Sequence, residues 1–303
     1  MRLRTIKIKV LFVLALLLVF IIVGTGIGWF MLNDTLGRHV PNSKELPSDR
    51  ALPYTLVSLV AIDGTKLSGW YINSGMPKAA VVIIPGLEEE TGGKTEPFAL
   101  NLAEFLYKNR IASLLLDTRG YGESEGDKVT LGIREWQDAV AAYEYLVDLP
   151  ELAGKPIGFV GDSMGASVAV AAAARSERGD FVIASVPMQN YRTAFRTWLK
   201  MEGYPAFLNP FLRSGALFYL GFDYGRYDTD TLVRKISVPI LLIGAEKDEV
   251  VGTDIDTLFL YANEPKKLWK PVGSTHVLVD EMERAYHAQV LDFIYEVLAM
   301  NNR

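Results

Sequence analysis

Three kinds of hydrophobic pattern follow one another along the 303-residue chain. A run without charged residues covers 10–32, and a polar stretch with three prolines covers 33–53. From residue 54 onward, short apolar runs alternate with segments of helical period. Fully apolar runs are typical of strands that are buried on both faces of a parallel sheet. The pattern therefore predicts an α/β domain over residues 54–303.

The expected elements of this domain can be placed one by one. Asp63-Gly64, between the alternating segments 55–62 and 66–73, predicts a hairpin. Further strands are expected at 79–84, 111–116, 157–160, 181–186, 240–243 and 267–270. Helices are expected at 95–110, 133–147, 164–174, 253–262 and 280–298. An irregular segment rich in aromatic residues, about 189–235, interrupts the alternation.

The charge-free run 10–32 is long enough to cross a membrane. Its 23 residues would form about 34 Å of helix, against about 30 Å of hydrocarbon. A cleaved signal peptide is the competing interpretation, with small residues at 24–26 as the cleavage site. Because apolar residues continue to Leu32, we favour an uncleaved anchor. Four basic residues in 1–9 then predict a cytoplasmic N-terminus, and the linker 33–53 and the domain would lie on the extracytoplasmic side.

Two details of the N-terminal region have more than one interpretation. Gly24 and Gly28 form a G-x-x-x-G step that could pack two such helices together. Lipid-facing glycines in an ordinary anchor are the simpler expectation. His39 lies in the polar linker, where we expect a solvated side chain.

Composition narrows the possible chemistry. The net charge of −5 argues against nucleic acid as a main partner. The chain has no cysteine, which excludes disulfides, a thiol nucleophile and zinc–thiolate sites. It has three histidines, His39, His276 and His287. His287 lies inside the last expected helix, where we expect a surface or packing residue.

The strongest local motif is G-x-S-x-G at residues 161–165, between an expected strand and an alanine-rich helix. In this context the serine occupies a sharp turn that exposes its hydroxyl. Ser163 should then have a strained backbone with positive φ, and Gly161 and Gly165 should leave room for the turn. Glycine and serine are common, so the motif needs an acid and a histidine to support it.

An acid and a histidine do follow, each after a later strand. Asp248 comes after strand 240–243, and functional groups collect at the carboxyl ends of strands in such sheets. Glu246 and Glu249 are rivals that spacing alone does not exclude. His276 lies in the loop before the last helix. The chain order serine, acid, histidine is the order expected for a triad on this kind of sheet.

These residues resemble the α/β-hydrolase family over about residues 54–300. The resemblance rests on residues 161–165, 117–124, 244–251 and 273–276. It implies an eight-stranded, mostly parallel sheet with helices on both faces and a small helical cap at 189–235. It also implies an oxyanion hole from two backbone N–H groups, those of Met164 and Leu87. Pro85-Gly86 stands where the family more often has His-Gly.

The resemblance implies a serine hydrolase with Ser163, Asp248 and His276 as its triad, and the charge-free run predicts that it is anchored in a membrane. Such an enzyme cleaves an ester, thioester or amide through an acyl-enzyme and needs no metal or organic cofactor. An esterase or lipase-like activity on a small-molecule or lipid-like ester is our first hypothesis. A serine peptidase and an acyltransferase use the same residues. A hydrolase fold reused as a binding module is the alternative that is not an enzyme.

The aromatic insertion provides candidates for substrate contact. Tyr191, Phe195 and Trp198 could form an apolar pocket over Ser163, or could belong to the core that a small cap needs. Arg192, Arg196 and Lys200 recur at helical spacing in the same segment. Such a stripe could face anionic lipid headgroups, and a solvated helix face is the simpler interpretation. Oligomeric state and acyl length stay open.

Overall fold

Eight strands form one sheet in the computed structural model, which describes residues 2–41, 45–87, 93–201, 203–221, 228–251 and 255–301. The strands are β1 (Tyr54–Val60), β2 (Lys66–Ile72), β3 (Ala79–Ile84), β4 (Ile111–Leu116), β5 (Ile157–Asp162), β6 (Phe181–Ser185), β7 (Ile240–Ile243) and β8 (Lys266–Trp269). Their order in the sheet is β1-β2-β4-β3-β5-β6-β7-β8. β2 pairs antiparallel with β1 and β4, and the other neighbours pair parallel. The expected eight-stranded, mostly parallel sheet is confirmed.

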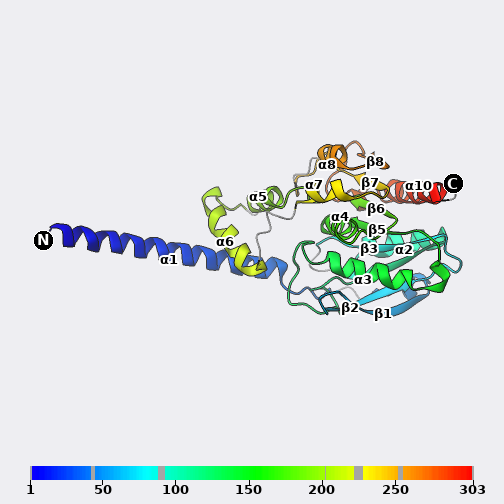
Figure 1. Cartoon of the computed structure of the whole chain (residues 1–303), viewed down its shortest axis with the longest axis horizontal. Helices are drawn as coiled ribbons and strands as arrows, with labels where there is room; N and C mark the ends of the chain where they lie inside the picture. Colours follow the sequence, from blue (N-terminus) through cyan, green and yellow to red (C-terminus); the bar gives the residue numbers. More distant parts are fainter. Residues whose placement is uncertain are drawn as a thin grey trace.

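Helices cover both faces of the sheet (Figure 1). One face carries α3 (Trp136–Val147), α4 (Met164–Ser176) and α8 (Ile255–Tyr261). The opposite face carries α2 (Pro97–Lys108) and α10 (Glu283–Asn301). Strands β3 to β6 are buried along their whole length, which explains their uninterrupted apolar sequences.

Shorter helices fill the connections. They are η1 (Pro47–Arg50), η2 (Gly93–Thr95), η3 (Pro150–Leu152), η4 (Ala206–Leu208), α7 (Thr229–Leu232), η6 (Val233–Lys235) and α9 (Leu278–Glu281). The helix expected at 280–298 is divided at Met282 into α9 and α10. The α/β-hydrolase fold class is confirmed by this arrangement.

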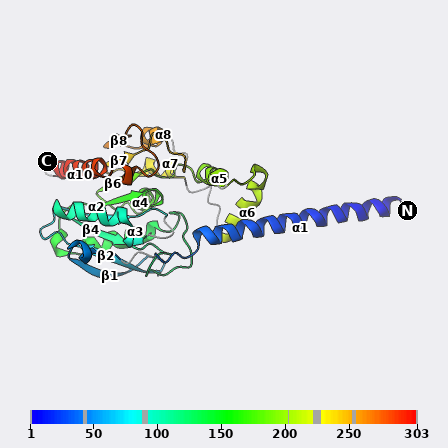
Figure 2. The same ribbon diagram turned by 180° about the vertical axis from the view of Figure 1, so that it is seen from behind.

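A long helix, α1 (Arg2–Leu36), projects from the domain (Figures 1 and 2). It extends four residues beyond the charge-free run, to Leu36. Apolar side chains between Ile6 and Val23 are exposed along it. Leu32 and Leu36, near its end, are buried in the body of the protein. Within the described residues, Ile6–Leu36 is long and apolar enough to cross a membrane.

The two longest helices that the structure describes in the aromatic insertion are α5 (Tyr191–Met201) and α6 (Asn209–Leu220), and α6 lies beside α1 in both views. A Cβ added at Gly24 would lie 2.7 Å from the Phe211 ring, and one at Gly28 would lie 2.8 Å from Leu212 Cα. A Cβ added at Gly215 of α6 would lie 2.5 Å from the carbonyl carbon of Gly28. The expectation of lipid-facing glycines is therefore wrong, because the G-x-x-x-G step of α1 contacts a cap helix of the same chain.

Aromatic contacts extend this interface in both directions. The rings of Phe20 and Phe211 lie 4.8 Å apart, edge to face. Those of Trp29 and Tyr219 lie 6.1 Å apart, also edge to face. Close backbone approach at the glycines lets these larger side chains meet on either side of the crossing. The cap is thus attached to α1 as well as to the sheet.

The residues after α1 are held by the loop that follows β4. The Arg38 guanidinium donates hydrogen bonds of 2.7–2.9 Å to the carbonyls of Gly122, Ser124 and Gly126. His39 is 7% exposed, and its ring stacks on Tyr121 with 5.0 Å between centroids. The expectation of a solvated His39 is wrong, because this loop covers it. The chain leaves the helix along a fixed path.

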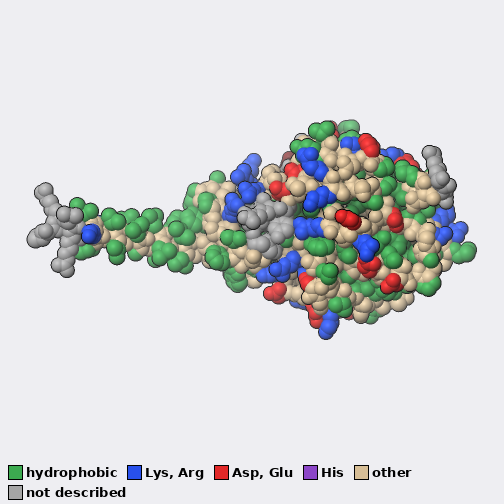
Figure 3. Space-filling view, viewed as in Figure 1, with side chains coloured by type: hydrophobic (Ala, Val, Ile, Leu, Met, Phe, Trp, Pro, Cys, Tyr) green, Lys and Arg blue, Asp and Glu red, His purple; other side chains and the backbone are tan. Residues whose placement is uncertain are grey.

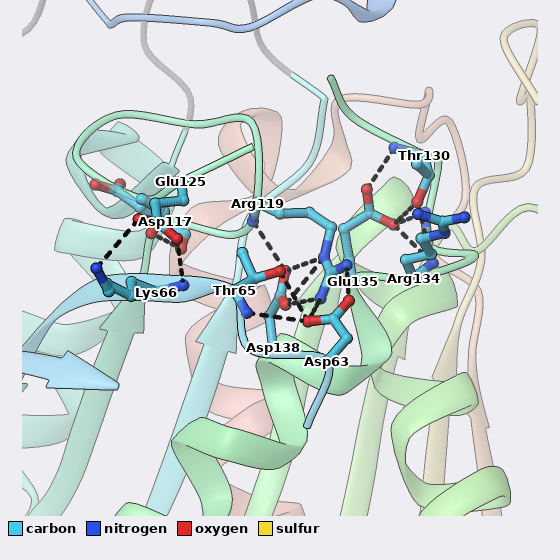
Figure 4. A network of polar contacts seen from close by, with 12 residues as sticks. Asp63, Thr65, Lys66, Asp117, Arg119, Glu125, Thr130, Arg134, Glu135 and Asp138 are labelled. Carbon is cyan, nitrogen blue, oxygen red and sulfur yellow. Dashed lines mark hydrogen bonds and ion pairs between the residues drawn. The ribbon is translucent and has the colours of Figure 1, made fainter. Parts of the chain in front are cut away.

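Arg119, in the loop that follows β4, forms ion pairs with acids of two other elements (Figure 4). Its guanidinium bonds Asp138 of α3 and Asp63 of the hairpin turn, each at 2.6 Å. Arg119 and Asp138 are buried, so the pair is well shielded from water. These two ion pairs connect the β1–β2 turn to α3.

Candidate active site

Ser163 occupies a strained turn between β5 and α4. Its φ is +49° and its ψ is −113°, as the motif predicted. A Cβ on Gly161 would collide with the carbonyl of Gly165, and a Cβ on Gly165 would collide with the carbonyl of Ile84. The two glycines therefore permit the turn, which raises the hydroxyl above the carboxyl edge of the sheet.

The structure brings Ser163, His276 and Asp248 into one hydrogen-bonded chain. Ser163 Oγ lies 3.0 Å from His276 Nε2, and His276 Nδ1 lies 2.9 Å from Asp248 Oδ2. The Asp248 side chain is only 3% exposed. Its other oxygen accepts the backbone N–H groups of Val250 and Val251, both at 3.1 Å. The carboxylate is thereby fixed in the orientation that faces the imidazole.

The rival acids occupy other positions. Glu246 accepts the backbone N–H of Gly273 at 2.6 Å, and so braces the loop that carries His276. Glu249 is exposed. A bridge between Lys247 and Thr275 joins the acid loop to the histidine loop. Spacing along the chain could not choose among the three acids, because only the folded loops decide which one meets His276.

The loop after β3 lies against the nucleophile. A Cβ added at Gly86 would lie 3.5 Å from Ser163 Cβ. Leu87 and Met164 both line the cavity above Ser163. Met164 is the first residue of α4, where the helix has no intrahelical partner for its N–H. These positions suit the two expected oxyanion donors.

Buried Lys94 holds the end of the segment that leads from β3 to α2. Lys94 Nζ bonds Asp117 at 2.7 Å and Glu123 at 2.6 Å, and the Lys94 side chain is 3% exposed. Its ammonium also lies over the Trp70 ring. Removing Asp117 would leave the buried Lys94 charge without its buried partner, so this pair holds the end of the loop firmly.

A cavity of about 400 Å³ opens above Ser163. Tyr191 and Phe195 line it, while the side chain of Trp198 lies outside the described residues. Helices α1 and α6 also contribute to the cavity wall, which the sequence did not predict. The lining residues of these two helices are Leu32, Thr35, Leu36, Ala216 and Leu220. The available signal was the spacing of Leu32 and Leu36, which continues one apolar helix face beyond the charge-free run.

Burial changes the ionisation of two groups in the cavity wall. It raises the pKa of Tyr191, whose hydroxyl donates to the carbonyl of Leu131 at 2.6 Å. Burial, followed by the nearby Glu283 and Glu281 carboxylates, raises the pKa of Asp280. Over the described part of the chain, no group of three or more His, Cys, Asp or Glu side chains is placed to hold a metal ion.

Comparisons with known proteins agree with this architecture. Residues 75–215 match the family model described as serine aminopeptidase, S33. The uncharacterized protein YfhR of Salmonella typhi is 24% identical over 80% of this chain and 82% of its own. A polyketide transferase of Stachybotrys chlorohalonatus is 30% identical over 45% of each chain. A solved esterase of Pyrococcus furiosus has a TM-score of 0.71 and 24% identity, over 86% of this chain and 98% of its own.

The sheet, the strand–serine–helix turn and these similarities define the class of the protein. It has the α/β-hydrolase fold, and residues 75–215 resemble the serine aminopeptidase family of hydrolases.

Proposed function

We propose that the protein is a serine hydrolase that cleaves carboxylic esters through an acyl-enzyme. The observation that carries the proposal is the chain of two hydrogen bonds from Ser163 through His276 to Asp248. A neutral imidazole in that position accepts the serine proton as the hydroxyl attacks a carbonyl. The buried carboxylate then stabilises the imidazolium that forms.

The remaining steps follow from the neighbouring groups. In the proposal, the N–H groups of Leu87 and Met164 stabilise the oxyanion, each contributing about 3 kcal/mol. His276 gives its proton to the leaving alcohol, and the acyl group stays on Ser163. Water, deprotonated by His276, then attacks the acyl-enzyme and releases the acid.

We also propose that α1 anchors the enzyme in a membrane. Its length, its apolar composition and the exposure of its side chains up to Val23 support this. Lys7 and Lys9 at its start favour a cytoplasmic N-terminus, which places the domain on the extracytoplasmic side.

Ester hydrolysis is preferred to the other reactions of this triad because the cavity is mostly apolar and the structural relative is an esterase. Acyl transfer is the second candidate, favoured by the similarity to a polyketide transferase. Product analysis in the presence of added alcohols separates the two. Transfer gives a new ester, while hydrolysis gives the free acid.

Fluorophosphonate labelling and ester hydrolysis test the proposal. Wild type should be labelled, and Ser163→Ala should lose labelling and about 10⁶-fold in kcat by analogy with other triads. Asp248→Asn should lose about 10⁴-fold, because the imidazole then adopts the wrong tautomer. Glu249→Gln, in the same loop, is the matched control and should keep wild-type activity. A folded wild type without labelling would sink the enzyme assignment and favour a binding module.

A further inference from the structure

The end of the projecting helix forms part of the active-site wall. Leu32, Thr35 and Leu36 line the same cavity as Ser163 and His276. These three residues are spaced i, i+3 and i+4, so they lie on one helix face. The element with the composition of a membrane anchor is therefore also an element of the substrate site.

The position of this wall relative to the bilayer can be estimated from α1. About 20 residues cross the hydrocarbon core, and counted from Val10 they end near Trp29, a residue type common at membrane interfaces. The first turns of α6, which contact Phe20 and Gly24, then lie at the level of the core. Leu32 and Leu36 then lie about 5 and 10 Å beyond the core at 1.5 Å per residue. The headgroup layer is about 5–8 Å thick on each side of the core, so Leu32 lies within it and Leu36 lies just outside it.

The cap carries both surfaces that a bilayer interface requires. Apolar side chains of η4 and α6 are exposed: Phe207, Leu217 and Phe218. Arg192, Arg196 and Arg213 line a second hollow between α5 and α6. Figure 3 shows Lys and Arg side chains gathered where the projecting helix meets the body. An apolar surface flanked by arginines matches acyl chains beneath anionic headgroups.

We propose that the substrate is an acyl ester resident in the membrane, and that its acyl chain reaches Ser163 from the bilayer against the α1 wall at Leu32, Thr35 and Leu36. The inference rests on the proposed ester hydrolysis and adds the source of the substrate. The cavity of about 400 Å³ is of a size that accepts one small ligand or acyl chain.

The reaction balances without a further reactant. Ser163 Oγ forms a bond to the ester carbonyl carbon, and the bond from that carbon to the alkoxy oxygen breaks. The alcohol leaves with the proton from His276. Water then adds to the acyl-enzyme, and the fatty acid leaves.

Delivery from the bilayer is tested with the full-length protein in vesicles. 4-Nitrophenyl palmitate is placed either in the vesicles that contain the enzyme or in separate vesicles, and 4-nitrophenyl butyrate is added in solution. The palmitate in shared vesicles should be hydrolysed at least about tenfold faster than in separate vesicles, because it is confined with the enzyme. Equal palmitate rates, or no palmitate hydrolysis beside active butyrate hydrolysis, overturn the inference. Loss of butyrate hydrolysis and of fluorophosphonate labelling in wild type means instead that the proposed function has failed.

The wall itself is tested by chain-length profiles from butyrate to palmitate. Thr35→Trp fills part of the cavity that a long acyl chain would occupy. It should lower kcat/KM for palmitate at least about tenfold relative to butyrate, because loss of the space for even one methylene in an apolar pocket costs about that factor. Asp34→Trp, an exposed position on the same turn, is the matched control and should keep the wild-type profile. Leu32→Ala enlarges the cavity and should shift the preference to longer chains. Unchanged profiles in both wall variants contradict the assignment of α1 to the acyl site.

Discussion

Ser163 and Asp63 each occupy a turn of the backbone and have a second role, Ser163 as the proposed nucleophile and Asp63 as the ion-pair partner of Arg119. The positive φ of Ser163 costs about 1–3 kcal/mol, and the packing of the neighbouring glycines maintains it. Asp63 is a turn residue of the β1–β2 hairpin, and its carboxylate also bonds the buried guanidinium of Arg119. Its hydrogen bonds with Arg119, and then with Thr65, lower the pKa of Asp63 to about 2.

The Asp63 carboxylate should make stability depend on pH in a defined window. A carboxylate whose pKa is depressed on folding stabilises the protein above its unfolded value of about 3.9. That contribution is lost as the pH falls through the folded value of about 2. Asp63→Asn should therefore lower the free energy of unfolding by about 1 kcal/mol at pH 7, since the pair is partly exposed.

Denaturant unfolding of the detergent-solubilised protein at several pH values measures this difference. The gap between wild type and Asp63→Asn should close between about pH 4 and pH 2. A gap that stays constant over this window would mean that the Asp63 charge does not contribute, and that the variant acts only through the turn.

At the scale of elements, α1 and α6 form one unit, although the sequence separates them by more than 170 residues. Gly24, Gly28 and Gly215 remove the side chains that would keep the two backbones apart. Phe20 and Phe211 then pack across the crossing. This contact positions Ala216 and Leu220 next to Leu32 in the cavity wall.

Separating these helices should expose α6. Gly28→Leu introduces a side chain where a Cβ already lies 2.8 Å from Leu212 Cα, so it should push α6 away. Trypsin should then cut after Arg213 about tenfold faster than in wild type, because cleavage follows the population of the opened helix. Gly26→Leu is the matched control, since no atom lies within 4 Å of a Cβ at that position. Equal cleavage of the two variants would show that α6 does not depend on α1.

The limits of prediction from sequence also appear at this scale. Strand and helix positions were predictable because each has its own apolar period. Ser163 and His276 were predictable because their motifs follow particular strands. The α1–α6 contact was not, since a G-x-x-x-G step is compatible with lipid, a second copy or a distant helix of the same chain. His39 was misjudged for a related reason, because a polar linker shows no period even when a loop covers it.

For the whole molecule, the composition of the chain provides a direct test of topology. With no native cysteine, a single introduced thiol reports its own side of the membrane. Met76→Cys, at a side chain that is 74% exposed on the domain, should react with an impermeant maleimide in intact cells. Ile6→Cys, at the start of α1, should react only after lysis, because the proposed orientation places the basic N-terminus in the cytoplasm. The reverse labelling pattern would contradict the proposed orientation.

The attachment of Arg38 to three loop carbonyls has a consequence for selectivity. With α1 in the membrane, as proposed above, this junction would hold Ser163 at one height above the bilayer, whereas a flexible linker would let it reach molecules at many heights. Esters would then be selected first by the depth of their carbonyl in the membrane, and second by how well their acyl chain fits the cavity. Two lipids with the same ester bond would then be hydrolysed at different rates if their carbonyls lay at depths in the membrane that differ by a few ångströms.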